Sequence, residues 1–272
     1  MEIEAKNIAV RFGRTQVMEG VDFAVRPGEM VGLIGPNGSG KTSLLRILAG
    51  LRPPEAGTVR YGGQTAAEIG RRELARQVAY LAQGGNVHWL MRVETLVGLG
   101  RLPHRRPFQG PDASDRQAIE RALEAADVVQ FRARTIGEVS SGERMRILLA
   151  RALAIEAGML LADEPIAALD PLHQLQVMTL LRKTAHEGGG VIVVLHDLPL
   201  AARFCDRLVL LAGGGILAEG APMQVLTDEH LADAFGVDVV RGEHDGVPFV
   251  LPWSQSASPH AGATVSAISQ SK

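Results

Sequence analysis

The sequence predicts an α/β protein in which a parallel sheet is flanked by helices. Three runs are apolar along most of their length: "MVGLIG" (30–35), "MLLADE" (159–164) and "VIVVLHD" (191–197). Helical segments separate these runs, and the glycine-rich stretch "GPNGSGKT" (35–42) overlaps the end of the first. Such apolar strands are typical of sheets that are buried on both faces, and strands that alternate with helices pair in parallel.

The composition agrees with this fold class. The chain has 272 residues, enough for one large domain, and 46% of them are hydrophobic but only 4% aromatic, so the core is expected to be aliphatic. The formal net charge of -2 and the isoelectric point near 6.5 predict no bulk attraction to nucleic acid or to anionic lipid. We therefore expect no nucleic-acid partner.

The single cysteine and the chain's apolar stretches bear on its compartment. Cys205 lies in the apolar segment "ARFCDRLVLL", which predicts a buried, unreactive thiol in a reducing compartment. The opening "MEIEAKNIAV" carries acidic residues and is not expected to be a signal peptide. Arg151 and Glu156 interrupt the most apolar stretch (147–162), which falls short of the roughly 18 apolar residues of a membrane span. Any membrane role would therefore come from a partner.

The first third of the chain predicts mostly strands and turns. Segments 3–12 and 17–35 read as strands of an antiparallel lobe that lead into the first buried strand. The segment "KTSLLRILAG" (41–50) is expected to form a helix that ends at Gly50, because glycine favours helix ends and prolines follow it. A strand at 57–63 and a helix that runs into a short strand over 71–83 complete this part.

The remainder predicts more helices and a closing hairpin. Residues 93–126 read as mostly helical, with an interruption at the proline- and glycine-rich segment 102–112. We expect one domain over 1–253, with a helical subdomain inserted at about 84–157, and a disordered serine- and alanine-rich tail over 254–272. Helices are also expected at 142–157, 172–187 and 228–235, and a hairpin at 206–220.

The stretch "GPNGSGKT" matches the phosphate-binding pattern G-x-x-x-x-G-K-[ST] between a buried strand and an apolar helix. Its glycines let backbone amides turn towards phosphate oxygens, and the helix N-terminus adds positive potential. Lys41 places a charge on the β- and γ-phosphates, and the hydroxyl of Thr42 is expected to bind magnesium. The expected nucleotide-binding residues are Gly35, Pro36, Asn37, Gly38, Ser39, Gly40, Lys41, Thr42 and Ser43.

Polar residues end the other strands. Asp163 and Glu164 are adjacent carboxylates at the end of an apolar strand, where they should meet a cation or a reacting water. We expect Asp163 to bind magnesium and Glu164 to polarise the attacking water. His196 and Gln83 also end predicted strands, where open α/β sheets place their ligands, and His196 is expected to contact the γ-phosphate.

A second candidate anion site lies in "EVSSGERMR" (138–146), where a turn of hydroxyl residues and glycine opens a helix. The free N–H groups of a helix start, together with its positive dipole end, favour an anion. One chain thus presents two phosphate-binding elements.

Six motifs occur in the order and spacing of ATP-binding cassette (ABC) transporter ATPases: "GPNGSGKT", "AQ" at Gln83, "VSSGE", "MLLADEP", "AALD" and "LHD". The resemblance extends to about Trp253. It implies a P-loop NTPase core with an antiparallel β lobe and a helical subdomain, and it implies ATP and Mg²⁺ as cofactors. It also implies residue roles: Phe12 resembles the aromatic that stacks on adenine, Gln83 the residue that touches magnesium and senses the membrane partner, Glu164 the catalytic base, His196 the switch histidine, and Asp170 the D-loop residue that crosses between subunits.

The same resemblance implies why two phosphate-binding elements occur in one chain. In this family the "VSSGE" segment (Ser140, Ser141, Gly142 and Glu143 with Val139) binds the γ-phosphate of ATP held by the other subunit, so a head-to-tail homodimer is expected. The sequence departs from the family at Ser141, where glycine is usual, at Val139, where leucine is common, and at Glu143, where glutamine is commoner. A Cβ at position 141 is expected to hinder backbone approach to the phosphate and to weaken closure.

Two further segments indicate the type of transporter. Residues 93–106 and 235–252, the latter with a hairpin turn at "HDG", resemble importer ATPases for iron–siderophore, haem and cobalamin uptake. This implies permease subunits, a periplasmic or extracellular substrate-binding protein, and a peripheral position on the cytoplasmic face of the inner (plasma) membrane. Trp89 and Met91 are expected to pack or dock rather than bind substrate. A soluble ABC ATPase of the cluster-assembly type and an exporter ATPase stay open as alternatives.

Overall fold

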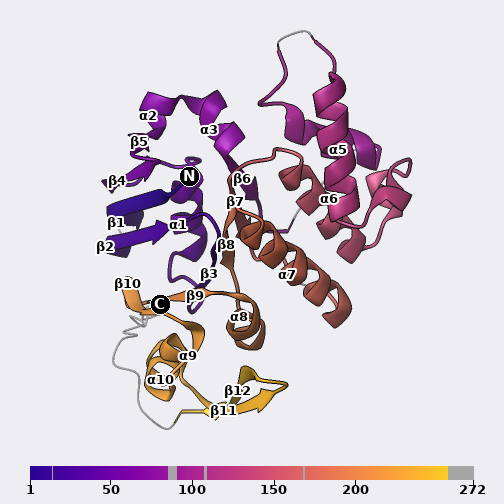
Figure 1. Ribbon diagram of the computed structural model, residues 1–272. Coiled ribbons are helices and arrows are strands. Elements are labelled where there is room, and N and C mark those ends of the chain that lie inside the picture. Colours follow the sequence, from indigo (N-terminus) through magenta and orange to yellow (C-terminus); the bar gives the residue numbers. More distant parts are fainter. Residues whose placement is uncertain (14, 85–90, 107–108, 168, 257–272) are drawn as a thin grey trace, which may run out of the picture.

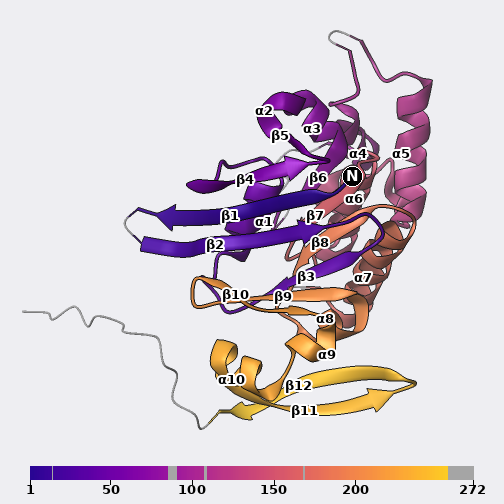
Figure 2. The same cartoon turned by 60° about the vertical axis from the view of Figure 1, so that its left-hand side comes forward.

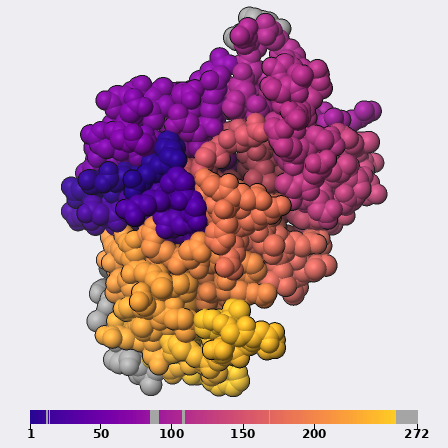
Figure 3. All heavy atoms as spheres, in the orientation of Figure 1, coloured from indigo at the N-terminus to yellow at the C-terminus, as the bar shows by residue number. Residues whose placement is uncertain are grey.

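The computed structural model describes residues 1–13, 15–84, 91–106, 109–167 and 169–256, and every structural statement below refers to these residues. The β lobe and the helical subdomain lie on opposite sides of a central sheet, as the two ribbon views agree (Figures 1 and 2). In the space-filling view the helical subdomain and the C-terminal hairpin occupy opposite ends of the visible face (Figure 3). The predicted α/β fold class is confirmed.

The β lobe is an antiparallel sheet with the strand order β2-β1-β4-β5. Along β2 (Thr15–Val25), apolar residues such as Val21, Phe23 and Val25 alternate inward, and they bury one face of the lobe. The other strands are β1 (Ile3–Phe12), β4 (Ala56–Tyr61) and β5 (Gln64–Thr65), and the short helices α2 (Ala66–Ile69) and α3 (Arg71–Gln77) follow.

The central sheet has the order β10-β9-β3-β8-β7-β6. Strands β3 (Met30–Ile34), β7 (Met159–Asp163) and β8 (Gly190–Val194) are buried along their whole length and pair in parallel, as the apolar runs predict. Strands β6 (Val78–Leu81) and β9 (Arg207–Ala212) extend the parallel sheet, and the hairpin partner β10 (Gly215–Gly220) adds an antiparallel edge.

Alternate residues of β3 enter two different cores. Met30 and Ile34 pack in the core that includes the helical subdomain, whereas Val31 and Leu33 pack with the β lobe and with α1 (Lys41–Leu48). The sheet is thus covered on both faces and holds the two halves of the molecule together.

The helical subdomain contains α4 (Val93–Gly98), α5 (Ala113–Ala125) and α6 (Ser141–Leu153), which pack on one another. Three turns of 3₁₀-helix, η1 (Leu99–Arg101), η2 (Val129–Phe131) and η3 (Ile136–Glu138), connect them. The helix expected to reach residue 157 ends earlier, at Leu153. Glu156 adopts a left-handed φ of 57°, which is incompatible with a continuing right-handed helix. The described helices α4, α5 and α6 lie within the range of about 84–157 that the sequence predicts for this subdomain.

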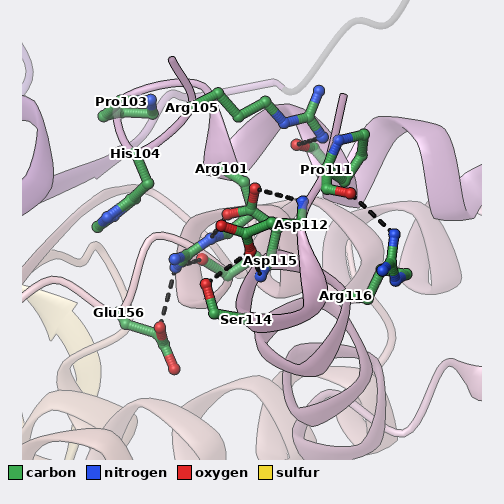
Figure 4. Close-up of polar contacts among 12 residues, drawn as sticks. Arg101, Pro103, His104, Arg105, Pro111, Asp112, Ser114, Asp115, Arg116 and Glu156 are labelled. Carbon is green, nitrogen blue, oxygen red and sulfur yellow. Dashed lines mark hydrogen bonds and ion pairs between the residues drawn. The ribbon is translucent and has the colours of Figure 1, made fainter. Parts of the chain in front are cut away.

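A buried arginine joins the ends of these helices (Figure 4). Arg101 is 4% exposed, and its Nε donates to Asp115 Oδ1 at 2.9 Å in the first turn of α5. Its Nη1 donates to the Ala154 carbonyl at 2.8 Å and to Glu156 Oε2 at 2.9 Å, just beyond α6. One guanidinium therefore satisfies a buried carboxylate and an open carbonyl at a helix end.

The C-terminal part completes the domain. Helix α7 (Pro171–His186) covers β8, and α8 (Leu198–Phe204) packs against the terminal hairpin of β11 (Val237–His244) and β12 (Val247–Gln255). Asp245 and Gly246 form the predicted turn with φ values of 51° and 75°. Strand β12 runs two residues past the expected domain end, and the rest of the predicted tail, 257–272, lies outside the described residues. Helices α9 (Pro222–Val225) and α10 (Asp228–Phe235) precede the hairpin.

The buried position expected for Cys205 is confirmed. Cys205 is buried, and burial raises the pKa of its thiol to about 12, which disfavours the reactive thiolate. Among the described residues, no helix combines the length and hydrophobicity that crossing a bilayer requires.

The Arg101 network predicts a large cost when its cation is removed. Arg101→Met leaves Asp115, which is 3% exposed, buried without its ion-pair partner, so the free energy of unfolding should fall by about 3–5 kcal/mol. Urea denaturation measures this. Arg121→Met is the matched control, because Arg121 pairs with the same Glu156 but is 53% exposed, and it should cost less than about 1 kcal/mol. Equal costs for the two variants would contradict the assignment.

Candidate functional site

The glycine-rich loop joins β3 to α1, and two of its glycines are required by its shape. A Cβ on Gly35 would lie 2.2 Å from the Leu211 carbonyl oxygen, so only glycine fits at the point where the chain leaves β3. Gly40 is the N-cap of α1, has a left-handed φ of 94°, and offers no side-chain cap. The first amides of α1 therefore stay available to an anion.

Lys41 is enclosed by this loop. Its Nζ donates to the carbonyl oxygens of Gly35 and Pro36, both at 2.8 Å, and the residue is 5% exposed. Burial lowers the pKa of Lys41, while the carboxylates of Glu164 and Asp163 act in the opposite direction. Both of these partners are carbonyl oxygens, which are weaker acceptors than phosphate oxygens, so an incoming phosphate can replace them.

A hydroxyl and a carboxylate meet where α1 faces the end of β7. The Thr42 hydroxyl donates to Asp163 Oδ1 at 3.0 Å, and Asp163 is fully buried. Oxygen donors of these two kinds are the ligands that Mg²⁺ prefers, so the pair predicted from sequence fits this ion.

Tyr80, which sequence reasoning did not select, holds the other carboxylate oxygen. Its hydroxyl donates to Asp163 Oδ2 at 3.1 Å, and Arg46 Nε lies 3.5 Å from that hydroxyl. A signal existed in the sequence: Tyr80 lies three residues before Gln83 on the predicted strand that runs beside the Asp163 strand.

The predicted catalytic residues converge at the carboxyl ends of three neighbouring strands. Glu164 follows β7, and its two carboxylate oxygens have separate partners. Gln83 Nε2, beyond β6, donates to Oε2 at 2.6 Å, and His196 Nε2, beyond β8, lies 2.7 Å from Oε1. Glu164 also has a left-handed φ of 50°, a conformation that is uncommon for a residue with a side chain and that aims the carboxylate out of the strand direction.

These groups border a cavity of about 310 Å³ above the loop. Its lining includes Lys41, Thr42 and Glu164, so the predicted phosphate-binding cation, the predicted metal-binding hydroxyl and the predicted base face one space. Val17 of the β lobe, Asn37, Gly38, Gly40 and Ser43 complete the lining.

Some predicted residues stay untested. Phe12 is the last residue of β1 and pairs with Thr15, but its side chain lies outside the described residues, so its role on adenine stays a prediction. Trp89 also lies outside them. Met91 is described and packs, partly buried, against the larger core, which agrees with its expected packing role.

The second anion site is the N-terminus of α6. Ser140 is its N-cap, and its Oγ accepts from the Glu143 amide at 3.3 Å while the Ser140 amide donates to Glu143 Oε2 at 2.7 Å. This reciprocal capping box engages the Ser140 and Glu143 amides, so the Ser141 and Gly142 amides are the first-turn donors left without an acceptor inside the helix. Ser141 is exposed, and its φ is not in the left-handed region, so its Cβ causes no strain within the chain; its effect on an approaching phosphate stays a prediction.

The two anion sites are separate within one chain. Neither Ser140 nor Gly142 lines the cavity above the glycine-rich loop, and among the described residues no side-chain hydrogen bond joins them to it. Each site therefore offers an open half of a phosphate-binding arrangement.

Comparisons with known proteins identify the class of protein. Residues 18–167 match the family model of the ABC transporter. The chain is 41% identical to the hemin import ATP-binding protein of Pseudomonas entomophila (strain L48) over 256 residues, which cover 92% of this chain and 99% of that protein. It is 38% identical to the cobalamin import ATP-binding protein of Halobacterium salinarum over 271 residues, 98% of this chain and 68% of that protein.

A comparison with a solved structure supports the same class of protein. The dimeric structure of a bacterial ABC transporter cassette superposes with a TM-score of 0.70 at 28% identity and covers 81% of this chain and 98% of that one. The chain therefore belongs to the ABC transporter family. More particularly, it is an ATP-binding subunit and an ATPase that uses ATP with Mg²⁺.

The Tyr80 contact predicts an effect on magnesium. Tyr80→Phe removes the hydrogen bond that orients the Asp163 carboxylate, so the Mg²⁺ concentration for half-maximal ATPase activity should rise about 10-fold. A magnesium titration at saturating ATP measures this. Tyr61→Phe is the control, because Tyr61 is the only other tyrosine and its hydroxyl faces the Ile47 carbonyl instead. An unchanged magnesium dependence of Tyr80→Phe would show that Asp163 needs no such support.

Proposed function

We propose that this chain is the ATP-hydrolysing subunit of an ABC importer that takes up a metal chelate of the hemin or cobalamin type. The observation that carries the proposal is the 41% identity to a hemin import ATP-binding protein over nearly that protein's whole length. The cobalamin import relative supports the same substrate group. An iron–siderophore is the third member of the group that the sequence predicts. Neither the soluble cluster-assembly ATPase nor the exporter ATPase is favoured by these relatives.

The loop and α1 bind the phosphates. On binding, the Lys41 ammonium exchanges its two carbonyl partners for phosphate oxygens, and the amides of the first turn of α1 add further donors. Thr42 and Asp163 would hold Mg²⁺, which supplies charge neutralisation on the phosphate oxygens. The remaining glycine-rich residues, Gly35 to Ser43, shape this cradle.

Glu164 acts as the general base. The oxygen of a water molecule attacks the γ-phosphorus, the bond to the oxygen bridging the β- and γ-phosphates breaks, and the Glu164 carboxylate takes the water's proton. Because an ionised carboxylate only accepts hydrogen bonds, the His196 contact places a proton on Nε2, and Gln83 donates from its amide. These two residues hold Glu164, and with nucleotide bound His196 would contact the γ-phosphate and Gln83 would contact the metal.

The active unit is a head-to-tail homodimer. Ser140, Ser141, Gly142 and Glu143 of one chain complete the phosphate site of its twin, and Asp170 lies at the crossing between subunits. The separation of the two anion sites within one chain and the dimeric cassette among the similar structures both support this arrangement. Closure around ATP and opening after hydrolysis supply the mechanical work of transport.

The partners are permease subunits and a periplasmic or extracellular substrate-binding protein that acts through them, with the ATPase at the cytoplasmic face of the inner membrane. A groove of about 650 Å³ between the end of α1 and α3 supports a docking place near Gln83. Its lining includes Leu51, which is 61% exposed, and Tyr80, three residues before Gln83. An exposed apolar residue in a groove suits a helix of a membrane partner.

The base assignment predicts that Glu164→Gln lowers the ATPase turnover by roughly 10²–10⁴ while ATP binding persists. The amide preserves the shape but cannot take a proton, so an ATP-bound dimer should accumulate. Phosphate release and size-exclusion chromatography with ATP measure both effects. Glu187→Gln is the control, since Glu187 pairs with Lys183 on the far end of α7. A fully active Glu164→Gln variant would dismiss Glu164 as the base.

The import assignment predicts stimulation by cargo. We expect ATPase activity of the chain, assembled with its permease in proteoliposomes, to rise when the hemin-loaded binding protein is added on the opposite side, and labelled hemin to accumulate only with ATP. Failure of the chain to co-purify with any polytopic membrane protein would instead support a soluble ATPase.

A further inference from the structure

A histidine that no motif includes lies between the two parts of the chain that face the other subunit. His173 is in the first turn of α7, three residues after Asp170, and its side chain is 22% exposed. The following inference rests on the proposed homodimer, because it concerns how one chain presents its surfaces to its twin.

Asp170 fixes the histidine from one side. Asp170 Oδ1 accepts the His173 amide at 3.0 Å as the N-cap of α7, and Oδ2 lies 2.6 Å from His173 Nδ1. These hydrogen bonds from the His173 amide and ring lower the pKa of Asp170, so the carboxylate is ionised at neutral pH. An ionised carboxylate only accepts, so the proton of this contact lies on Nδ1, and the ring orientation is set.

Gly142 meets the ring from the other side. A Cβ on Gly142 would lie 2.6 Å from His173 Cγ, 2.7 Å from Cδ2 and 2.9 Å from Nδ1. The imidazole therefore rests directly on the backbone of α6 one residue after Ser141. Gly142 is buried, and its φ lies outside the left-handed region, so the position needs glycine for space and not for backbone freedom.

We propose that His173 is a positioning residue that couples Asp170 to the N-terminus of α6, so that the D-loop and the "VSSGE" segment of one chain approach the twin's nucleotide as one unit. Without the imidazole, the α6 N-terminus loses its contact with α7 at this point. Helix α6 belongs to the helical subdomain and α7 covers the central sheet, so the contact lies where these two parts of the chain meet (Figure 1).

The contact itself is tested by a double-mutant cycle in thermal unfolding. Alanine is a better helix former than glycine, so Gly142→Ala should raise the unfolding midpoint of the His173→Ala chain, where the clash is gone. In the chain with His173 it should lower the midpoint, because the new Cβ strikes the ring. The same sign and size of shift in both backgrounds would overturn the contact as the reason for glycine.

The coupling is tested in the full chain carrying Glu164→Gln, which should form a stable ATP-bound dimer. Adding His173→Ala should raise the protein concentration required for dimer formation about 10- to 100-fold, because the α6 N-terminus is displaced. Affinity of the monomer for a fluorescent ATP analogue should change less than about twofold, because His173 lies outside the cavity above the loop. His186→Ala is the matched control, since His186 lies on the same helix and also contacts an aspartate, Asp206.

Two conservative variants separate the two contacts. His173→Asn keeps a donor for Asp170 but no ring, and His173→Phe keeps a ring but no donor. Each should recover part of dimer formation and neither all of it. Full recovery by either variant, or unimpaired dimer formation by His173→Ala, would overturn the coupling. If the Glu164→Gln chain with His173 intact fails to dimerise with ATP, the homodimer proposal fails instead.

Discussion

The adjacent carboxylates at the end of β7 are the constraint on which the site depends. Two anions on neighbouring residues, one of them fully buried, are unfavourable unless separate partners satisfy each. The fold supplies those partners from different elements: Thr42 and Tyr80 on Asp163, and Gln83 and His196 on Glu164. Because these partners come from α1, from β6 and the residues after it, and from the residues after β8, satisfying this pair fixes how the start of α1 and the carboxyl ends of β6, β7 and β8 meet at one edge.

The same edge bears on the proposed homodimer. The glycine-rich loop offers its amides and Lys41 on one side of the phosphates, while the α6 N-terminus, on the helical subdomain, offers its amides elsewhere on the surface. A single rigid chain cannot bring the glycine-rich loop and the α6 N-terminus to the same phosphate. In the proposed homodimer two copies would, and the bound nucleotide would be part of the contact between them, so its hydrolysis would change the assembly as well as the ligand.

Much of the fold was predictable, because local signals and buried patterns agree. Fully apolar strands, the glycine at each sharp exit and the capped helix starts act over a few residues, so the parallel sheet, the β lobe and the phosphate-binding loop follow from the sequence. The helix predicted to reach residue 157 was too long, because Ala154 and Glu156 are directed by Arg101, which lies more than fifty positions earlier in the chain. Such a distant contact leaves no local pattern.

The sequence by itself determined which residues are candidates for phosphate chemistry, since the loop, the paired carboxylates, Gln83 and His196 each have a pattern within a few positions. Only the tertiary structure decided which distant side chains contact these residues and hold them in place. Tyr80 reaches Asp163 because two strands lie side by side, and His173 reaches Gly142 because the first turn of α7 lies against the start of α6. The physical reason is that hydrogen bonds and close packing depend on distances in space, which chain spacing does not fix.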